Sequence, residues 1–163
     1  LVDTCVSDLA GGDDLAWRQR LAERVENGAN QGNPHYRFMY AMWGAADRQI
    51  GLEENSVAEY EIKAREYTGL NLDDEPKLAL LAMGVSYSEG DFFTPYNPDL
   101  GKAYLYAAGK CGFDATSVSK LVEKYQLQRI LLTKAGKLAP ENVQEIVAAS
   151  ERIYQHWCSG FSH

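Results

Sequence analysis

The sequence predicts an all-α protein of about seven or eight helices. Apolar residues recur every three or four positions along most of the chain, which is the spacing of one helix face. Asn-Pro pairs and glycines punctuate these stretches where helices commonly start and stop. No stretch alternates apolar and polar residues long enough to form a strand. Short loops between the helices favour antiparallel neighbours.

The first half of the chain carries three of the expected helices. The first covers residues 13–30, and the second covers 33–52, where Asn33-Pro34 supplies a cap residue followed by proline at the first helical position. The third begins near residue 55 and is expected to end at Gly69, because glycine commonly terminates helices.

The second half carries four further helical stretches. Pro76 and Pro140 are expected in first turns, and Asn97-Pro98 repeats the start signal of Asn33-Pro34. Gly136 is expected to end the third stretch, which forms one helix or two. The stretches are 73–90, 97–112, 114–138 and 139–160.

Composition limits the class of protein and its partners. The 163 residues, 45% of them apolar, predict a single domain over residues 1–163. The net charge of −7 argues against binding to nucleic acid, which requires basic patches. No apolar run reaches the roughly 18–20 residues that span a bilayer, so no membrane insertion is expected.

Three cysteines lie far apart in the sequence and show no zinc-site spacing. Two interpretations stay open: one pair among Cys5, Cys111 and Cys158 forms a disulfide in an exported protein, or the thiols are buried and free. The chain begins at Leu1 rather than Met, which we interpret as removal of an N-terminal segment by export processing or otherwise. A periplasmic or other exported location is expected, with the cytoplasm as the alternative.

Motifs that carry chemistry do not stand out. The histidines His35, His156 and His163 form no His-x-x-x-His pair, and no Gly-x-Ser-x-Gly or phosphate-binding glycine motif occurs. Cys158 lies two residues after His156, and such residues point apart on a helix. We therefore expect no catalytic residue, no metal, no cofactor and no enzymatic activity.

Small and aromatic residues are spaced regularly over residues 79–115. Such small residues are expected where two helices approach closely, with aromatic rings filling the remaining gaps. Gly32, Gly69 and Gly112 mark comparable junctions between helices. The pattern in 79–115 consists of Ala79, Met83-Gly84, Tyr87, Gly90, Asp99, Lys102-Ala103, Tyr104, Ala108-Gly109, Gly112 and Ala115.

This pattern resembles a unit of the Sel-like repeat family, which is related to the tetratricopeptide repeats. Residues 28–69 resemble a degenerate unit, and both ends of the chain are expected to be capping helices. The resemblance implies a solenoid-like stack of antiparallel helix pairs. It also implies binding of another protein, since members are mostly adaptors and small exported bacterial members include immunity proteins that sequester toxins.

The loop between Gly90 and Asp99 is longer than in the family pattern and is rich in aromatic residues. Exposed aromatic side chains are typical interface anchors, although a loop packed on the helices is the alternative. The candidate partner-binding residues are Asp91, Phe92, Phe93, Tyr96 and Asp99.

The expected function is therefore that of a toxin-binding immunity or inhibitor protein, which occludes a secreted effector. One alternative is an adaptor or scaffold in a cell-envelope or signalling assembly. Another is a hydrolase on a helical scaffold, which a pocket joining a carboxylate to His35 or His156 would favour.

Overall fold

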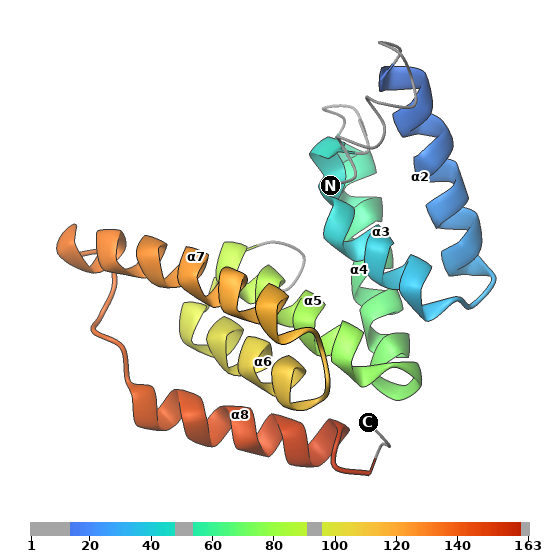
Figure 1. Ribbon diagram of the computed structural model, residues 1–163. Coiled ribbons are helices and arrows are strands. Elements are labelled where there is room, and N and C mark those ends of the chain that lie inside the picture. The colour runs from blue at the N-terminus through green and yellow to red at the C-terminus, as the bar shows by residue number, and fades with distance from the viewer. Residues whose placement is uncertain (1–13, 48–53, 91–95, 161–163) are drawn as a thin grey trace. The chain divides into compact units, whose positions relative to one another are not determined.

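A computed structural model describes residues 14–47, 54–90 and 96–160 of the chain. Within these ranges it contains seven helices and no strand, which confirms the all-α class (Figure 1). The helices are α2 (Asp14–Asn30), α3 (Pro34–Asp47), α4 (Glu54–Asp74), α5 (Pro76–Glu89), α6 (Pro98–Lys110), α7 (Ala115–Lys134) and α8 (Val143–Trp157).

The chain divides into two compact units, and the boundary falls within α4. Unit 1 comprises residues 1–67, and unit 2 comprises residues 68–163. The expectation of one domain over residues 1–163 stays a prediction. Tyr96, Asp99, Cys111 and Cys158 all belong to unit 2, so the described part of the candidate site lies within one unit.

Side-chain caps set most of the helix starts. Asn33 accepts a hydrogen bond from the backbone N–H of His35 at 2.9 Å, so α3 begins where the Asn-Pro pair predicted. Asp114 accepts bonds from the backbone and hydroxyl of Ser117, and these bonds lower the pKa of its carboxyl. The expected start at Pro140 is wrong: α8 begins at Val143, because Asn142 caps the N–H of Glu145 at 3.2 Å.

The expected helix stop at Gly69 is also wrong, because α4 continues to Asp74. Buried positions recur at helical spacing on both sides of the glycine, at Tyr60, Ala64, Tyr67 and Asn71. A continuous buried stripe outweighs the modest helix penalty of one glycine. By contrast, Gly32 and Gly112 do end helices, with φ of 92° and 104° in the left-handed region.

Unit 1 packs around tyrosines. A Cβ built on Gly28 of α2 would lie 2.3 Å from the ring of Tyr36, so α2 and α3 approach closely only because residue 28 is glycine. The ring of Tyr40 stacks on Tyr60 at 5.6 Å and meets Tyr67 edge-on at 5.1 Å. The Tyr60 hydroxyl donates to the Ala41 carbonyl at 2.7 Å, which satisfies the polar end of a buried ring.

Unit 2 is built on the close pair α5 and α6. A Cβ at Gly101 of α6 would lie 2.3 Å from Ser88 Oγ and 2.9 Å from the carbonyl of Gly84 on α5. A Cβ at Gly84 would in turn lie 2.7 Å from the side chain of Leu105. Gly84 is thus a contact position between two helices, as the sequence predicted, whereas Gly90 and Gly112 lie at helix ends.

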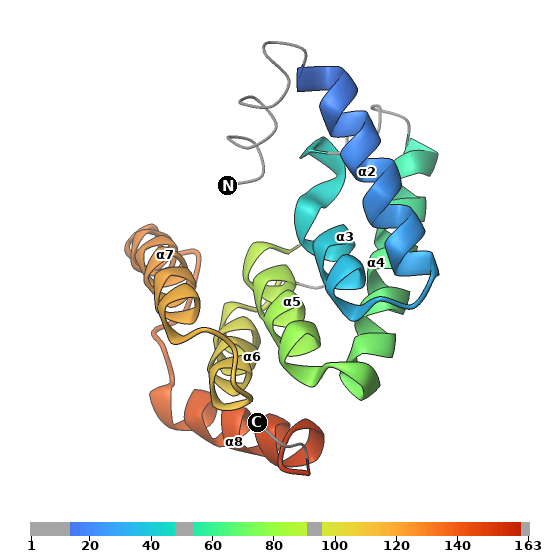
Figure 2. The ribbon, with the colours of Figure 1, turned by 45° about the vertical axis from the view of Figure 1, so that its right-hand side comes forward.

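Helix α6 lies between α7 and α8 in both views (Figures 1 and 2). Helices α6 and α8 run parallel, because the Lys102–Glu141 ion pair joins their starts and the Cys111–Cys158 disulfide joins their ends. Helix α7 packs on the other side of α6, where Arg129 reaches Asp99. The solenoid-like stacking of pairs and the Sel-like resemblance stay predictions.

Candidate partner-binding groove

The structure describes two of the five predicted binding residues. Asp91, Phe92 and Phe93 lie outside the described residues. Tyr96 is 42% exposed immediately before the cap of α6, and Asp99 lies in the first turn of that helix. An exposed tyrosine at the end of a long loop fits the expected interface anchor.

Two hydrogen bonds of Asn97 and a close contact at Gly90 fix the start of α6. Asn97 caps the N–H of Leu100 at 3.1 Å, and its own backbone N–H donates to the carbonyl of Tyr87 on α5 at 3.0 Å. Gly90 ends α5 with φ of 73°, and a Cβ there would lie 3.3 Å from the Cβ of Tyr96. The two ends of the loop therefore meet, and Tyr96 is held beside the first turn of α6.

A groove of about 430 Å³ opens beside this turn, between α6 and α8. Its α8 wall combines a pair of alanines with one carboxylate and one guanidinium, and its α6 wall adds a second carboxylate. The small alanine side chains leave space between the helices, and the charged groups offer polar contacts of both signs. The lining residues are Asn97, Asp99, Leu100, Glu145, Ile146, Ala148, Ala149 and Arg152.

Polar contacts from α6 to α7 and to the segment before α8 hold this arrangement in place. Arg129 of α7, only 5% exposed, pairs with Asp99 and donates to the Ala139 carbonyl at 3.0 Å. Lys102 pairs with Glu141 and donates to Gln126 at 2.9 Å. Asp99 thus serves as a buried arginine's partner as well as lining the groove, so its carboxylate is oriented before any ligand arrives.

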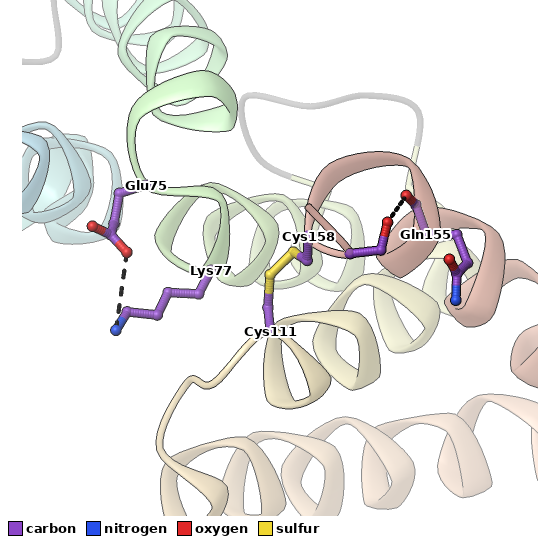
Figure 3. The surroundings of a disulfide bond; sticks show 6 residues. Glu75, Lys77, Cys111, Gln155 and Cys158 are labelled. Atoms are coloured by element: carbon purple, nitrogen blue, oxygen red, sulfur yellow. Dashed lines mark hydrogen bonds and ion pairs between the residues drawn. A yellow bond between two sulfur atoms is a disulfide. The ribbon is translucent and has the colours of Figure 1, made fainter. Parts of the chain in front are cut away.

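A disulfide fixes the far end of α8. Cys111 and Cys158 are bonded with a Cα–Cα distance of 5.6 Å across a sequence separation of 47 residues (Figure 3). Both side chains are buried, at 6% and 0% exposure. This finding favours the disulfide over the free thiols for Cys111 and Cys158, while Cys5 lies outside the described residues.

Side-chain hydrogen bonds order the end of α8 next to this disulfide. Ser159 Oγ donates to the Gln155 carbonyl at 2.7 Å, a bond that Figure 3 marks with a dashed line at Gln155. Gln155 Nε2 donates to Glu151 at 3.0 Å. The bond from Gln155, together with the Lys110 ammonium, lowers the pKa of the Glu151 carboxyl. The same view includes the Glu75–Lys77 ion pair, 3.9 Å long, at the start of α5.

The tyrosines of the repeat-like segment pack on one another. The ring of Tyr87 lies nearly parallel to that of Tyr104, with centroids 5.7 Å apart. Burial raises the pKa of Tyr104 above the usual value for tyrosine, and electrostatic repulsion from the neighbouring Tyr87 raises it further. The stacked rings of Tyr87 and Tyr104 thus pack α5 against α6, as the contact pattern predicted.

The histidines do not join the groove. His35 is exposed near the start of α3, and the exposed His156 lies edge-on against Trp157 at 4.6 Å. Neither lines the groove between α6 and α8. Within the described residues no group of three or more His, Cys, Asp or Glu side chains could hold a metal ion.

Sequence patterns missed the residues that form the α8 wall of the groove. Glu145, Ala148, Ala149 and Arg152 lie in the last helix, which the pattern predicts to be a cap. The one sequence signal for this wall is Ala148-Ala149, a pair of small residues inside an amphipathic helix. Such a step leaves room either for a neighbouring helix or for a ligand.

No protein-family model, no curated protein and no solved structure matches the chain. Among the described helices, none is long and apolar enough to cross a membrane.

Proposed function

We propose that this protein is an exported helical binding module that sequesters another protein, a secreted toxin effector, through the loop at Tyr96 and the adjoining groove. It acts by steric occlusion, without chemistry of its own. The observation that carries the proposal is the groove itself: an exposed aromatic residue lies beside a preformed depression whose α6 wall is capped and ion-paired.

The geometry suits a protein ligand better than a small molecule. The groove is open and lies between two exposed helix faces, whereas small-molecule sites bury most of their ligand. Tyr96 supplies a ring at low entropic cost, and Asp99, Glu145 and Arg152 supply charges for orientation. The net charge of −7 favours the approach of a basic partner.

The disulfide supports an exported location. Disulfides persist in the periplasm and outside the cell, and are reduced in most cytosols. A buried bond that joins α6 to α8 also holds the groove's two walls together at one end. A periplasmic toxin-immunity role, similar to that of small Sel-like repeat proteins, combines these features.

Site-specific photo-crosslinking in the source organism tests the proposal. A photoreactive phenylalanine analogue replaces Tyr96 in one strain and Gln144 in another, because Gln144 is exposed on α8 outside the groove. The expected result is one dominant adduct from position 96 and none from position 144. Co-expression of the captured protein in a heterologous host should be toxic, and this chain should relieve the toxicity.

Groove variants provide the matched control. Ala149→Arg fills the groove and should weaken partner binding by tenfold or more, whereas Gln144→Arg adds the same charge on the same helix and should leave it unchanged. Replacing Phe92, Phe93 and Tyr96 with serine should abolish binding while circular dichroism stays constant. Adducts with several envelope proteins would favour the scaffold alternative, and turnover of a small molecule would contradict the binding proposal.

A further inference from the structure

The outer face of α7 carries a regular row of exposed side chains. Lys120, Lys124, Leu127, Leu131 and Lys134 follow one another at alternating spacings of four and three, which places them on one helix face. Leu127 and Leu131 are 62% and 61% exposed. We call these five residues the α7 ridge.

The ridge points away from α6. Tyr125 and Arg129 are buried residues of α7, and each ridge leucine follows one of them by two positions, or roughly 200° around the helix. Ile130, 43% exposed, lies beside Leu127 and Leu131 and widens the apolar centre. Three neighbouring exposed aliphatic side chains form a patch rather than scattered surface residues, and such patches mark interaction sites.

The ridge is basic although the chain is acidic. Its lysines lie at both ends of the apolar centre. The single acidic residue of α7, Glu123, lies on the same face between Lys120 and Leu127. Lys124 lies 3.4 Å from Glu89, but both side chains are largely exposed and such pairs contribute little. Three exposed lysines against one exposed glutamate on this helix, in a chain of net charge −7, are a local reversal of sign.

We propose that the α7 ridge is a docking surface for an amphipathic helix of a partner protein, with Asp or Glu at both ends of an apolar face. Aliphatic residues spaced as Leu127 and Leu131 pack against a second helix, and the flanking lysines select acidic ends and fix the orientation. From Lys120 to Lys134 the ridge is about 21 Å long, which corresponds to a partner helix of roughly 14 residues.

Charge decides between this occupant and two others. An anionic bilayer would attract the ridge but repel the rest of a chain whose net charge is −7. A second copy would bring two acidic surfaces together. An acidic helix pairs with the lysines of the ridge, and it avoids this repulsion because the rest of the acidic surface stays in solvent. The ridge is separate from the groove, which lies between α6 and α8.

A synthetic peptide tests the ridge without knowledge of the natural partner. The probe is a capped 18-residue helix with leucine at spacings of three and four, glutamates at both ends and glutamine elsewhere. The protein is the full oxidised chain labelled with ¹⁵N, titrated at low and at physiological salt. Amide shifts should change along α7, and affinity should fall as salt rises.

Matched variants locate the contact. Leu127→Ser/Leu131→Ser should weaken peptide binding by tenfold or more, and Lys120→Glu/Lys124→Glu should weaken it and flatten the salt dependence. Val143→Ser/Val147→Ser is the control, because these valines form a similarly exposed pair on α8, 59% and 53%, beside Glu145. That variant should bind as the parent does, and a peptide with lysine in place of glutamate should not bind.

Three results would overturn the proposal. The first is failure of the glutamate peptide to bind, or equal weakening by the α8 control variant. The second is binding to phosphatidylglycerol vesicles that requires Leu127 and Leu131 while the peptide fails, which would assign the ridge to a membrane surface. The third is a dimer in sedimentation that Leu127→Ser/Leu131→Ser dissolves, which would assign it to a second copy.

Discussion

The interface between α5 and α6 and the interface between α6 and α8 hold unit 2 together in different ways. Eleven of the 14 residues of α5 are buried, and Gly84 and Gly101 let side-chain and backbone atoms of α5 and α6 approach closely. Helix α8 buries only Ile146 and Ser150 along its 15 residues, and is held by ion pairs and a disulfide. The α5–α6 interface therefore depends on close packing, whereas the α6–α8 interface depends on ion pairs and one disulfide.

This difference suits the two sides to different roles. Such close packing fixes α5 and α6 and leaves no room for a ligand. A helix held at its two ends can leave space along its length, and the groove lies in that space. Removing the links should therefore affect α8 and the groove, whereas filling a glycine should affect the whole unit.

The largest effect should come from the disulfide. Cys111→Ser/Cys158→Ser frees a loop of about 47 residues in the unfolded chain and should lower the free energy of unfolding by up to about 4 kcal/mol. Urea denaturation measures the change, and hydrogen exchange locates it. Amides of α8 should lose protection first while those of α5 and α6 keep theirs; unchanged protection in α8 would mean that packing alone holds this helix.

A pair of glycine substitutions should give effects of opposite sign. Gly101→Ala places a methyl group against Ser88 and the Gly84 carbonyl, and should destabilise the protein by about 1–3 kcal/mol. Gly69→Ala is the control, because nothing lies within 4 Å of that position inside α4; it should stabilise by about 0.5–1 kcal/mol. Equal effects in thermal unfolding would show that α5 and α6 can separate without cost.

The smallest effect should come from the polar link beneath the groove. Asp99→Asn leaves the buried Arg129 guanidinium without its carboxylate and should cost about 1 kcal/mol, since Asp99 itself is half-exposed. Lys110→Ala removes one side of the exposed Lys110–Glu151 pair and should cost less than about 0.5 kcal/mol. If the two variants unfold at the same urea concentration, the buried Arg129–Asp99 pair contributes no more to stability than the exposed Lys110–Glu151 pair.

Local sequence signals predicted most helix starts correctly, but they did not predict how far α4 extends or which helices contact one another. Asn33 and Asn97 cap the helices that they were expected to cap, because a cap requires only the following turn. The predicted helix end at Gly69 was wrong, because the weak tendency of glycine to end a helix is outweighed by burial of Tyr67 and Asn71 on either side. Local preference yields whenever a longer buried stripe opposes it.

The groove could be predicted only in part, because local patterns do not encode contacts between residues that lie far apart in the sequence. Tyr96 and Asp99 were found because a long aromatic loop is visible in the sequence. Arg129 and Glu145 were not, because their roles arise from contacts across 30 residues or from a parallel pairing of helices that no local pattern encodes. The cysteines narrowed the choice to a few pairings, and the fold selected Cys111–Cys158.

The same disulfide has a consequence for protease resistance. The segment between α7 and α8 is largely exposed and contains Lys137, so it is open to trypsin-like enzymes. Because Cys111 precedes this segment and Cys158 follows it, a single cut there leaves both fragments covalently joined. In a protease-rich compartment, the chain could be nicked beside its groove and still keep both walls of the groove on one molecule.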